Sequence, residues 1–369
     1  MFSDGFTNRA ASGDVSAPRF LLASGGDVLE ARGALVSYRD TAAALAALHR
    51  SEQRIIVGAI PFDLDDRVAL VAPEETAHRR VGRLDAGGAL PPLVVTAQRP
   101  APDEHLTRVA EVIRRIERGR LDKAVLARAV EFAAAAPVDP VRLARELARR
   151  DPAGNAFLAD LSAAGGEYVG RFLVGSSPEV LVERRGAVVT CHPLAGTATR
   201  PDGLLDSDKD RAEHAYVVDA IAEVLAPLCD TLDVPPRPSL TRAGDLWHLG
   251  TVITGRLRDP GTTALDLALA LHPTPAVCGI PRVAAARAIA EVEGPRGFYA
   301  GAVGWTDATG DGQWRVSIRC AEIAPDGRSL RAWAGGGIVA ASDPATELAE
   351  TANKLRTVLG PFDIEQWVA

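Results

Sequence analysis

The sequence lacks the features that mark several common classes of protein. Its four cysteines lie far apart without a C-x-x-C pair, which favours small buried hydrophobic side chains over zinc ligands. No apolar run approaches the length of a membrane span. Residues 1–10 hold no basic segment followed by an apolar one, as a secretory signal would. These absences predict a cytoplasmic protein.

The chain also lacks an excess of positive charge. It has 41 lysines and arginines against 48 aspartates and glutamates, which gives a net charge of −7, and the two signs are mixed along the chain. Proteins that bind nucleic acid or an anionic membrane need a basic stripe. We therefore expect neither partner, and an anionic substrate would need positive charge gathered at its own site.

Length and hydrophobic periodicity favour an α+β protein. The 369 residues bury a sizeable core without disulfides, and segments rich in proline and glycine are too short to be flexible linkers. Strands are expected at residues 54–60, 124–132, 172–174, 180–183, 187–191 and 314–323, the last as one alternating strand. Helices are expected at residues 104–118, 141–150, 207–229 and 345–359. Their order shows no regular βαβ alternation, which indicates large antiparallel sheets.

Two of the expected helices carry acids in unusual places. On a helical wheel, Asp210 and Glu213 share the face of helix 207–229 that also supplies Val217 and Ile221 to the core. A buried unpaired carboxylate is costly, so something positive should meet these acids. Alternatively, the buried stripe begins one turn later, and both acids lie solvated in the first turns, where the helix dipole stabilises them.

Helix 345–359 repeats this pattern with Glu347, Glu350 and Lys354 on one face. A surface Glu350–Lys354 pair at i,i+4 would explain two of them. Two helices that each offer acids at i,i+3 could instead hold one Mg²⁺ ion, which prefers a few carboxylates, several waters and an anionic substrate. The nearby run of glycines at 335–337 could turn N–H groups toward an anion or could form a tight turn.

Nine segments of the sequence resemble the chorismate-utilising enzymes, in the order of that family. They are residues 121–128 (LDKAVLAR), 175–179 (GSSPE), 192–197 (HPLAGT), 208–214 (DKDRAEH), 246–251 (LWHLGT), 271–276 (LHPTPA), 301–305 (GAVGW), 317–321 (SIRCA) and 347–351 (ELAET). Many collinear segments are far more specific than one short motif. Residues 58–63 (GAIPFD) also look like the isochorismate synthase branch.

The resemblance implies a fold and a set of partners. The fold would be anthranilate/isochorismate synthase-like α+β, with two large antiparallel sheets packed together and helices outside. Residues 1–369 would form a single chorismate-binding catalytic domain, with the core motifs in 100–360 and with 1–99 as the N-terminal part of the same fold. The substrate would be chorismate, and the protein would be a monomer without a glutaminase subunit.

The resemblance also implies the residues of the site. Glu213 and Glu350 would ligate Mg²⁺ directly, and Asp210 and Glu347 would support it through water. The catalytic residues would be Lys123 as general base, Glu179 as general acid, and His248 as a histidine of the site, although a histidine beside Trp247 could also be a core group. The substrate-binding residues would be Leu194, Gly196, Ala276, Tyr299, Arg319, Gly335 and Lys354, with Tyr299 and Arg319 at the pyruvyl carboxylate.

The chemistry that the resemblance implies needs a base and an acid on opposite sides of the ring. Water must enter at C2 while the C4 hydroxyl leaves. An unperturbed lysine is charged and an unperturbed glutamate is ionised at pH 7, each the wrong form for its task. Burial in a dry cleft would favour the neutral form of both Lys123 and Glu179. A lysine at a strand end is otherwise usually solvated.

Three positions favour isochorismate synthase within the family. Enzymes that add ammonia typically carry Gln where this chain has Lys123, and they usually follow the metal-ligating Glu with an Arg-Asn-Asp triplet, whereas this chain continues with VVDAIA over residues 217–222. Salicylate synthases, which also expel pyruvate, usually have Thr where this chain has Ala276. Val277, Cys278 and Gly336 depart from the usual Leu, Ser and Ala. The alternatives are a salicylate synthase and a non-catalytic chorismate-binding homologue, and the product could feed menaquinone or siderophore biosynthesis.

Overall fold

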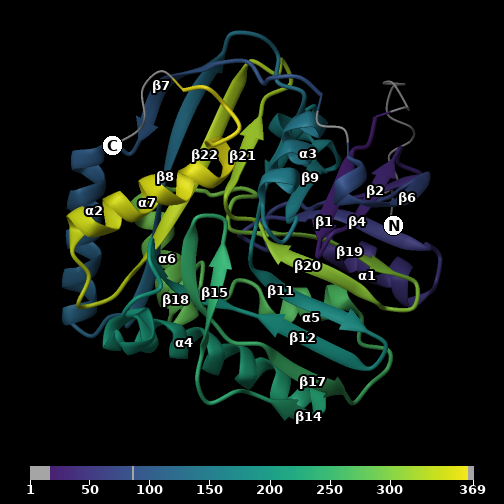
Figure 1. Ribbon diagram of the computed structural model, residues 1–369. Helices are drawn as coiled ribbons and strands as arrows, with labels where there is room; N and C mark the ends of the chain where they lie inside the picture. Colours follow the sequence, from purple (N-terminus) through teal and green to yellow (C-terminus); the bar gives the residue numbers. More distant parts are fainter. Residues whose placement is uncertain (1–16, 85–86, 365–369) are drawn as a thin grey trace, which may run out of the picture.

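A computed structural model describes residues 17–84 and 87–364, in which antiparallel strands dominate (Figure 1). The larger of two large sheets has ten strands. In spatial order they are β18 (Gly279–Ile280), β8 (Lys123–Ala134), β22 (Ser329–Ile338), β21 (Cys320–Ile323), β10 (Phe172–Gly175), β9 (Ala156–Asp160), β1 (Phe20–Ser24), β2 (Asp27–Arg32) and β6 (Glu75–Arg80), with β7 (Leu93–Arg99) also paired to β8.

The second large sheet has nine strands, and a third sheet has three. The nine are β14 (Cys229–Asp233), β17 (Ile253–Leu257), β12 (Val188–His192), β11 (Val180–Arg185), β20 (Gly312–Val316), β19 (Ala302–Asp307), β4 (Ile55–Ile60), β5 (Ala69–Ala72) and β3 (Val36–Tyr38). The small sheet consists of β13 (Leu194–Ala198), β16 (Leu246–Gly250) and β15 (Ser239–Ala243). The α+β prediction with large antiparallel sheets is confirmed.

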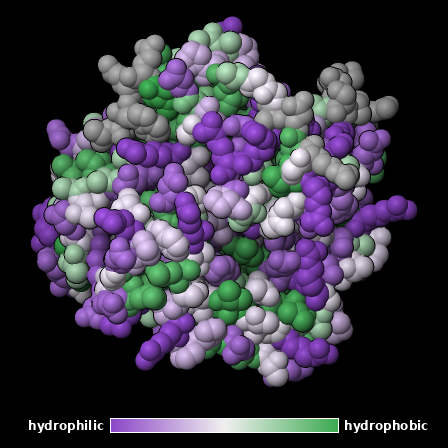
Figure 2. Space-filling model, in the orientation of Figure 1, coloured by the Kyte–Doolittle hydropathy of each residue, from purple (hydrophilic) through white to green (hydrophobic). Residues whose placement is uncertain are grey.

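The two large sheets bury a common apolar core. Phe157 of the ten-stranded sheet and Ile60 and Trp314 of the nine-stranded sheet are fully buried in one continuous cluster. Removing this much apolar surface from water is the main favourable contribution to folding. On the face in Figure 2, polar and apolar side chains are mixed without a large apolar patch.

Helices lie outside the sheets. They are α1 (Thr41–His49), α2 (Pro102–Glu117), α3 (Pro140–Arg150), α4 (Asp208–Leu225), α5 (Ala264–Leu271), α6 (Arg282–Glu293) and α7 (Pro344–Leu359). Asp139 and Asp343 cap α3 and α7, and a proline follows each cap at the first helical position, where its missing N–H costs nothing. Helix α7 crosses strands β8 and β22 in Figure 1, and α2 packs beside it. None of the helices in the described ranges is long and apolar enough to cross a membrane.

The prediction of one strand over residues 314–323 is wrong. Strand β20 ends at Val316 in the nine-stranded sheet, and β21 begins at Cys320 in the ten-stranded sheet. Between them Arg319 adopts a left-handed backbone with φ of 53°. The alternation was misleading because its polar face is also buried: Ser317 Oγ donates to Phe298 O at 2.6 Å.

The predicted helix 207–229 is too long at its carboxyl end. Helix α4 ends at Leu225, and a 3₁₀ turn over Ala226–Leu228 leads into β14 at Cys229. Pro227 explains the early end, because a proline inside a helix lacks the N–H donor and its ring clashes with the preceding turn.

The N-terminal segment contributes strands to both large sheets. Strands β1, β2 and β6 extend the ten-stranded sheet, and β3, β4 and β5 extend the nine-stranded one. This supports the proposal that residues 1–99 belong to the same domain as 100–360. Residues 1–10, where we expect no secretory signal, lie outside the described residues.

Candidate active site

A cavity opens where strands β8, β13, β16 and β22 meet helices α4 and α7. Its lining includes eleven predicted site residues from strands, helices and the loops between them, namely Glu179, Leu194, Gly196, Glu213, His248, Ala276, Tyr299, Arg319, Gly335, Glu350 and Lys354. The other predicted residues lie next to this lining. Lys123 is paired with Glu213, Asp210 packs against Gly196, and Glu347 precedes Glu350 by one helical turn.

Helix α4 brings Asp210 and Glu213 to the inner side of the site. Val217 and Ile221 continue the buried face of this helix. Burial alone would raise the pKa of Glu213, but the nearby charge of Lys123 holds this pKa below its ordinary value. Asp210 is half-buried, and burial raises its pKa. The buried stripe thus includes Glu213, and the alternative of two fully solvated acids does not apply.

Helix α7 contributes Glu347 and Glu350. Glu347 is 1% exposed, and burial together with the charge of Glu350 raises its pKa. Lys354 Nζ lies 2.6 Å from Glu350 Oε1, and only 14% and 21% of these two side chains are exposed. The pair therefore lies inside the cavity wall and differs from the surface pair that the wheel also allowed.

Three lysines neutralise three glutamates of this cluster. Besides the Lys354–Glu350 pair, Lys123 Nζ lies 3.0 Å from Glu213 Oε1, as an ion pair without hydrogen-bond alignment, and Lys209 Nζ lies 2.9 Å from Glu347 Oε1. These three are the only lysines among the 41 basic residues of the chain. The other 38 of these basic side chains are arginines, so all lysine amines of the chain lie at this site.

The glycine run at 335–337 lies inside strand β22 and forms neither a tight turn nor an exposed anion-binding loop. Gly337 pairs with Val125 of β8 in regular register. A Cβ atom on Gly337 would come within 2.0 Å of Glu213 Oε1, and one on Gly336 within 2.9 Å of Glu347 Oε2. Glycine is thus required because carboxylates from two helices approach the strand backbone closely.

The four carboxylates provide donors that suit Mg²⁺. They are hard oxygen ligands, and the raised pKa values of Asp210 and Glu347 reflect burial and crowded like charges that a cation would relieve. Within residues 17–84 and 87–364, no three acidic, histidine or cysteine side chains already form a metal-binding group. Three of the glutamates face lysine amines, so a metal ion would have to replace these partners.

Glu179 stands in the turn between β10 and β11, on the cavity wall. It is 3% exposed, and burial raises its pKa to about 8, although the nearby charge of Lys123 and a hydrogen bond from the backbone of Leu194 oppose this rise. At pH 7 its carboxyl group is therefore mostly protonated and able to donate a proton. A general acid needs this form.

His248 and Arg319 form a buried polar pair. Arg319 Nη2 lies 3.1 Å from His248 Nε2, and His248 Nδ1 lies 3.0 Å from Gly196 O. Because an arginine only donates, Nε2 must accept, and Nδ1 carries the proton that is donated to Gly196. Burial and the charge of Arg319 lower the pKa of His248 well below its ordinary value. His248 is therefore neutral and orients Arg319.

Arg319 presents to the cavity a positive charge that forms no direct ion pair among the described residues. Burial lowers its pKa to about 10, and it pairs with no carboxylate within 4.0 Å among the described residues. Tyr299 lines the same cavity, and its ring stacks on Trp333 at a centroid distance of 5.7 Å. Nearby, Lys354 Nζ donates to Gly335 O at 2.9 Å. A buried guanidinium without a counter-ion is suited to bind a carboxylate of a substrate.

Comparisons with known proteins match this sequence to one family. Residues 51–362 match the family described as chorismate binding enzyme. A Mycobacterium tuberculosis protein provisionally named isochorismate synthase MenF is 48% identical over 361 residues, which cover 95% of this chain and 97% of the relative. The isochorismate synthase DhbC of Bacillus subtilis is 43% identical over 329 residues, 84% of this chain and 81% of the relative.

The chain belongs to the chorismate-binding enzyme family. It lies in the isochorismate synthase branch, since its relatives at 43% and 48% identity carry that name. A crystal structure provisionally identified as the 2,3-dihydroxybenzoate-specific isochorismate synthase DhbC of Bacillus anthracis superposes with a TM-score of 0.84 at 37% identity, covering 93% of this chain and 95% of that one. The expected anthranilate/isochorismate synthase-like fold is confirmed.

Sequence reasoning missed some residues of this chorismate-binding site. Lys209 and Ser342 both hold Glu347, at 2.9 Å and 2.7 Å from Oε1. Thr197 also lines the cavity, and its Oγ1 lies 3.2 Å from His248 Nδ1. The scarcity of lysine was the available signal for Lys209, because a chain that otherwise uses arginine retains lysine at three positions only.

Proposed function

We propose that this chain is an isochorismate synthase that converts chorismate to isochorismate and depends on Mg²⁺. The observation that carries the proposal is the placement of Lys123 and Glu179. Lys123 is fully buried at the start of β8, and the buried carboxyl of Glu179 has a pKa near 8. A buried amine and a protonated carboxyl beside one cavity form the base and acid pair that hydroxyl exchange requires.

Substrate orientation would rest on two positive groups. Arg319, held by His248, would bind the pyruvyl carboxylate with the hydroxyl of Tyr299 beside it. Lys354, held by Gly335 O, would face the ring carboxylate. Two separated carboxylate contacts fix the ring in the cavity, and fixed orientation of reacting groups is a large part of enzymatic rate enhancement.

Lys123 and Glu179 would then move the protons. The oxygen of a water molecule bonds to C2 while Lys123 accepts one of its protons, and the ring double bonds shift toward C4. The C4–O bond breaks with its electron pair on oxygen, which takes the proton of Glu179 and leaves as water. One water enters and one leaves, so chorismate and isochorismate have the same formula.

The metal would be held by the carboxylates of α4 and α7. Glu213 and Glu350 would be direct ligands, and Asp210 and Glu347 would act through water. When bound, Mg²⁺ supplies positive charge that neutralises a substrate carboxylate. Because Glu213 is the counter-ion of Lys123, its use as a ligand would also leave Lys123 without a charged partner.

The first prediction concerns the product. Incubation with chorismate and Mg²⁺ should yield isochorismate with little pyruvate, and added ammonia should not yield an aminated ring. Chromatography separates isochorismate from salicylate, and a lactate dehydrogenase-coupled assay detects pyruvate. Ala276→Thr should raise pyruvate release, because it places a hydroxyl beside the bound ring. Pyruvate released by the unmodified protein in step with chorismate consumption would make it a salicylate synthase.

The second prediction concerns the alkaline side of the pH profile. Glu179 must be protonated to act as acid, and its pKa is raised to about 8, so activity is present below this pH and is lost as pH rises through it. The value of kcat/KM should fall about tenfold per pH unit above this point. The complete profile should be bell-shaped, with limbs that belong to the interacting pair. If the pH profile of Glu179→Gln kept the same alkaline limb, that limb would belong to the titration of another group.

A further inference from the structure

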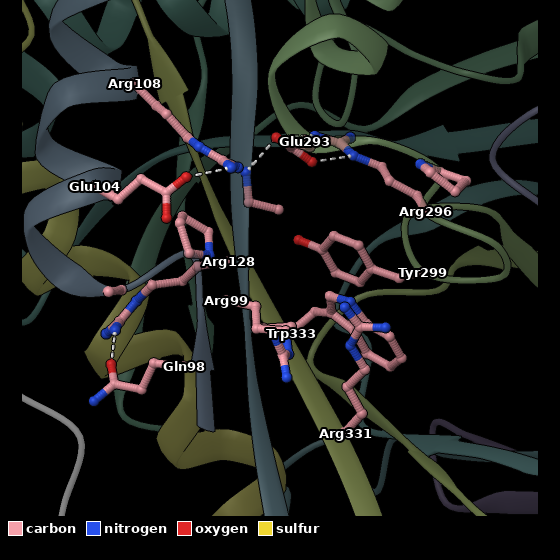
Figure 3. Close-up of a pocket in the computed structure, with 15 residues that line it drawn as sticks. Gln98, Arg99, Glu104, Arg108, Arg128, Glu293, Arg296, Tyr299, Arg331 and Trp333 are labelled. Atoms are coloured by element: carbon pink, nitrogen blue, oxygen red, sulfur yellow. Dashed lines mark hydrogen bonds and ion pairs between the residues drawn. The ribbon is translucent and has the colours of Figure 1, made fainter. Parts of the chain in front are cut away.

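A second cavity of about 390 Å³, shown in Figure 3, shares Tyr299 with the first. It exists because one edge of β8 is only partly covered. Strand β18 pairs with residues 123–124 and β7 with residues 129–134, which leaves residues 125–128 without a strand on that edge. Side chains fill part of the gap: Glu293 Oε1 accepts from Ala127 N at 2.6 Å, and Arg296 Nη2 donates to Val125 O at 2.7 Å.

The lining of this second cavity is strongly cationic. Five arginines and two glutamates line it, namely Arg99, Arg108, Arg128, Arg296, Arg331, Glu104 and Glu293. The chain as a whole carries a net charge of −7, so this concentration of positive charge is local. Four of the arginines have carboxylate partners within 4.0 Å, contributed by Glu104, Glu131 and Glu293.

Arg128 is the exception. It is 1% exposed, Nε donates to Thr351 Oγ1 at 2.7 Å, and Nη1 donates to Gln98 Oε1 at 2.8 Å. Nη2 has no hydrogen-bond partner among the described residues, and no carboxylate compensates the charge. A buried charge without a partner is costly, and a buried donor left unpaired adds to that cost. An anion in the cavity would relieve both.

The opposite wall of the cavity is aromatic. Trp333 stacks on Tyr299 and carries the Arg331 guanidinium 5.4 Å above its ring, and Pro100 and Pro295 add further apolar surface. Figure 3 shows Tyr299 and Trp333 on one side of β8 and the α2 side chains Glu104 and Arg108 on the other. Cavities of this volume with a mixed lining bind small molecules. The walls therefore suit an anion that also has an apolar skeleton.

We propose that this cavity is a second binding site, for a small organic carboxylate whose charged group pairs with Arg128 and whose carbon skeleton rests against Trp333. Tyr299 belongs to the walls of both cavities, so a ligand in the second cavity would contact a residue of the proposed chorismate site. The proposal concerns binding to the protein alone and stands independently of the reaction catalysed in the first cavity.

Calorimetric titration of the full chain with benzoate tests the proposal. A ligand of this size should bind with a Kd of about 1–10 mM. Inorganic phosphate, which has charge but no apolar skeleton, should bind at least about tenfold more weakly. Arg128→Met and Arg108→Gln should each weaken benzoate binding, the first by about tenfold or more, because it removes a charged hydrogen-bond donor. Arg108 lies on the accessible face of α2, so its variant remains informative if Arg128→Met unfolds.

Two controls locate the binding. Arg118→Gln removes an exposed arginine of the same region that does not line the cavity and should leave the benzoate Kd unchanged. Arg319→Gln removes the cation of the first cavity and should also leave it unchanged. The proposal would be overturned if benzoate did not bind at 10 mM, which is about the upper end of the expected range, or if phosphate bound with equal affinity. It would also be overturned if Arg319→Gln lost affinity for benzoate and the Arg108 and Arg128 variants did not.

Discussion

Replacing Lys123 by alanine or Glu179 by glutamine should each lower kcat by about 10²–10⁴-fold, the usual contribution of a general base or acid. Both side chains are buried beside the cavity, and both act in the chemical step, so KM should change much less than kcat. Steady-state kinetics with purified variants gives both parameters. A variant with kcat near that of the unmodified protein would remove the residue from its proposed role.

The two substitutions need a control for folding. Lys123→Ala leaves Glu213 without its ion-pair partner, so a lower melting temperature is expected for this variant. Circular dichroism and thermal denaturation separate such destabilisation from loss of chemistry. Asp122→Asn changes an exposed residue next to Lys123 and should keep full activity.

Removing Mg²⁺ should abolish turnover, and restoring it should recover turnover. EDTA followed by excess Mg²⁺ tests this directly. Glu350→Gln and Glu213→Gln keep the shape of the side chain but remove its charge. Each should weaken Mg²⁺ binding by more than about 10²-fold. Replacing a residue that only hydrogen-bonds to a metal ligand already lowers metal affinity by about 10- to 100-fold. Full turnover in metal-free buffer would refute the metal requirement.

The two glutamates differ as test sites. Glu213 is the counter-ion of fully buried Lys123, and breaking a buried pair by removing one partner costs about 3–5 kcal/mol. Glu350 is more exposed, so Glu350→Gln separates metal affinity from stability more cleanly. Calorimetric Mg²⁺ titration measures the affinity without substrate. Glu223→Gln, on the exposed face of α4, is the matched control and should bind Mg²⁺ normally.

The sequence predicted those parts of the site that depend on local periodicity. The helical wheel placed Glu213 on a buried face, and the strand starting near Lys123 follows from its run of mostly apolar residues. The family resemblance supplied Glu179 and Arg319, which no periodic pattern identifies. The residues that surround Glu179 and Arg319 come from segments that are remote in the chain, as the contact between His248 and Arg319 illustrates.

Features that depend on pairing between distant segments were not predictable in this way. The break between β20 and β21 arises because the two halves of one alternating run join different sheets. The need for glycine in β22 arises because Glu213 and Glu347 from two distant helices approach the backbone of Gly337 and Gly336. The second cavity depends on which edge of β8 is left uncovered, and no local pattern encodes this.

The scarcity of lysine makes the ε-amines of this protein selective spectroscopic reporters. Reductive methylation with ¹³C-formaldehyde attaches labels to lysine amines and to the chain terminus, and Lys123, Lys209 and Lys354 are the only lysines present. Each is paired with a different glutamate of the candidate metal site. Because Lys209 and Lys354 are partly exposed and Lys123 is fully buried, a carbon NMR spectrum of the protein labelled in its folded state should contain resonances of the first two lysines without background from other lysines. Their changes on adding a divalent cation would show in what order the ion pairs open.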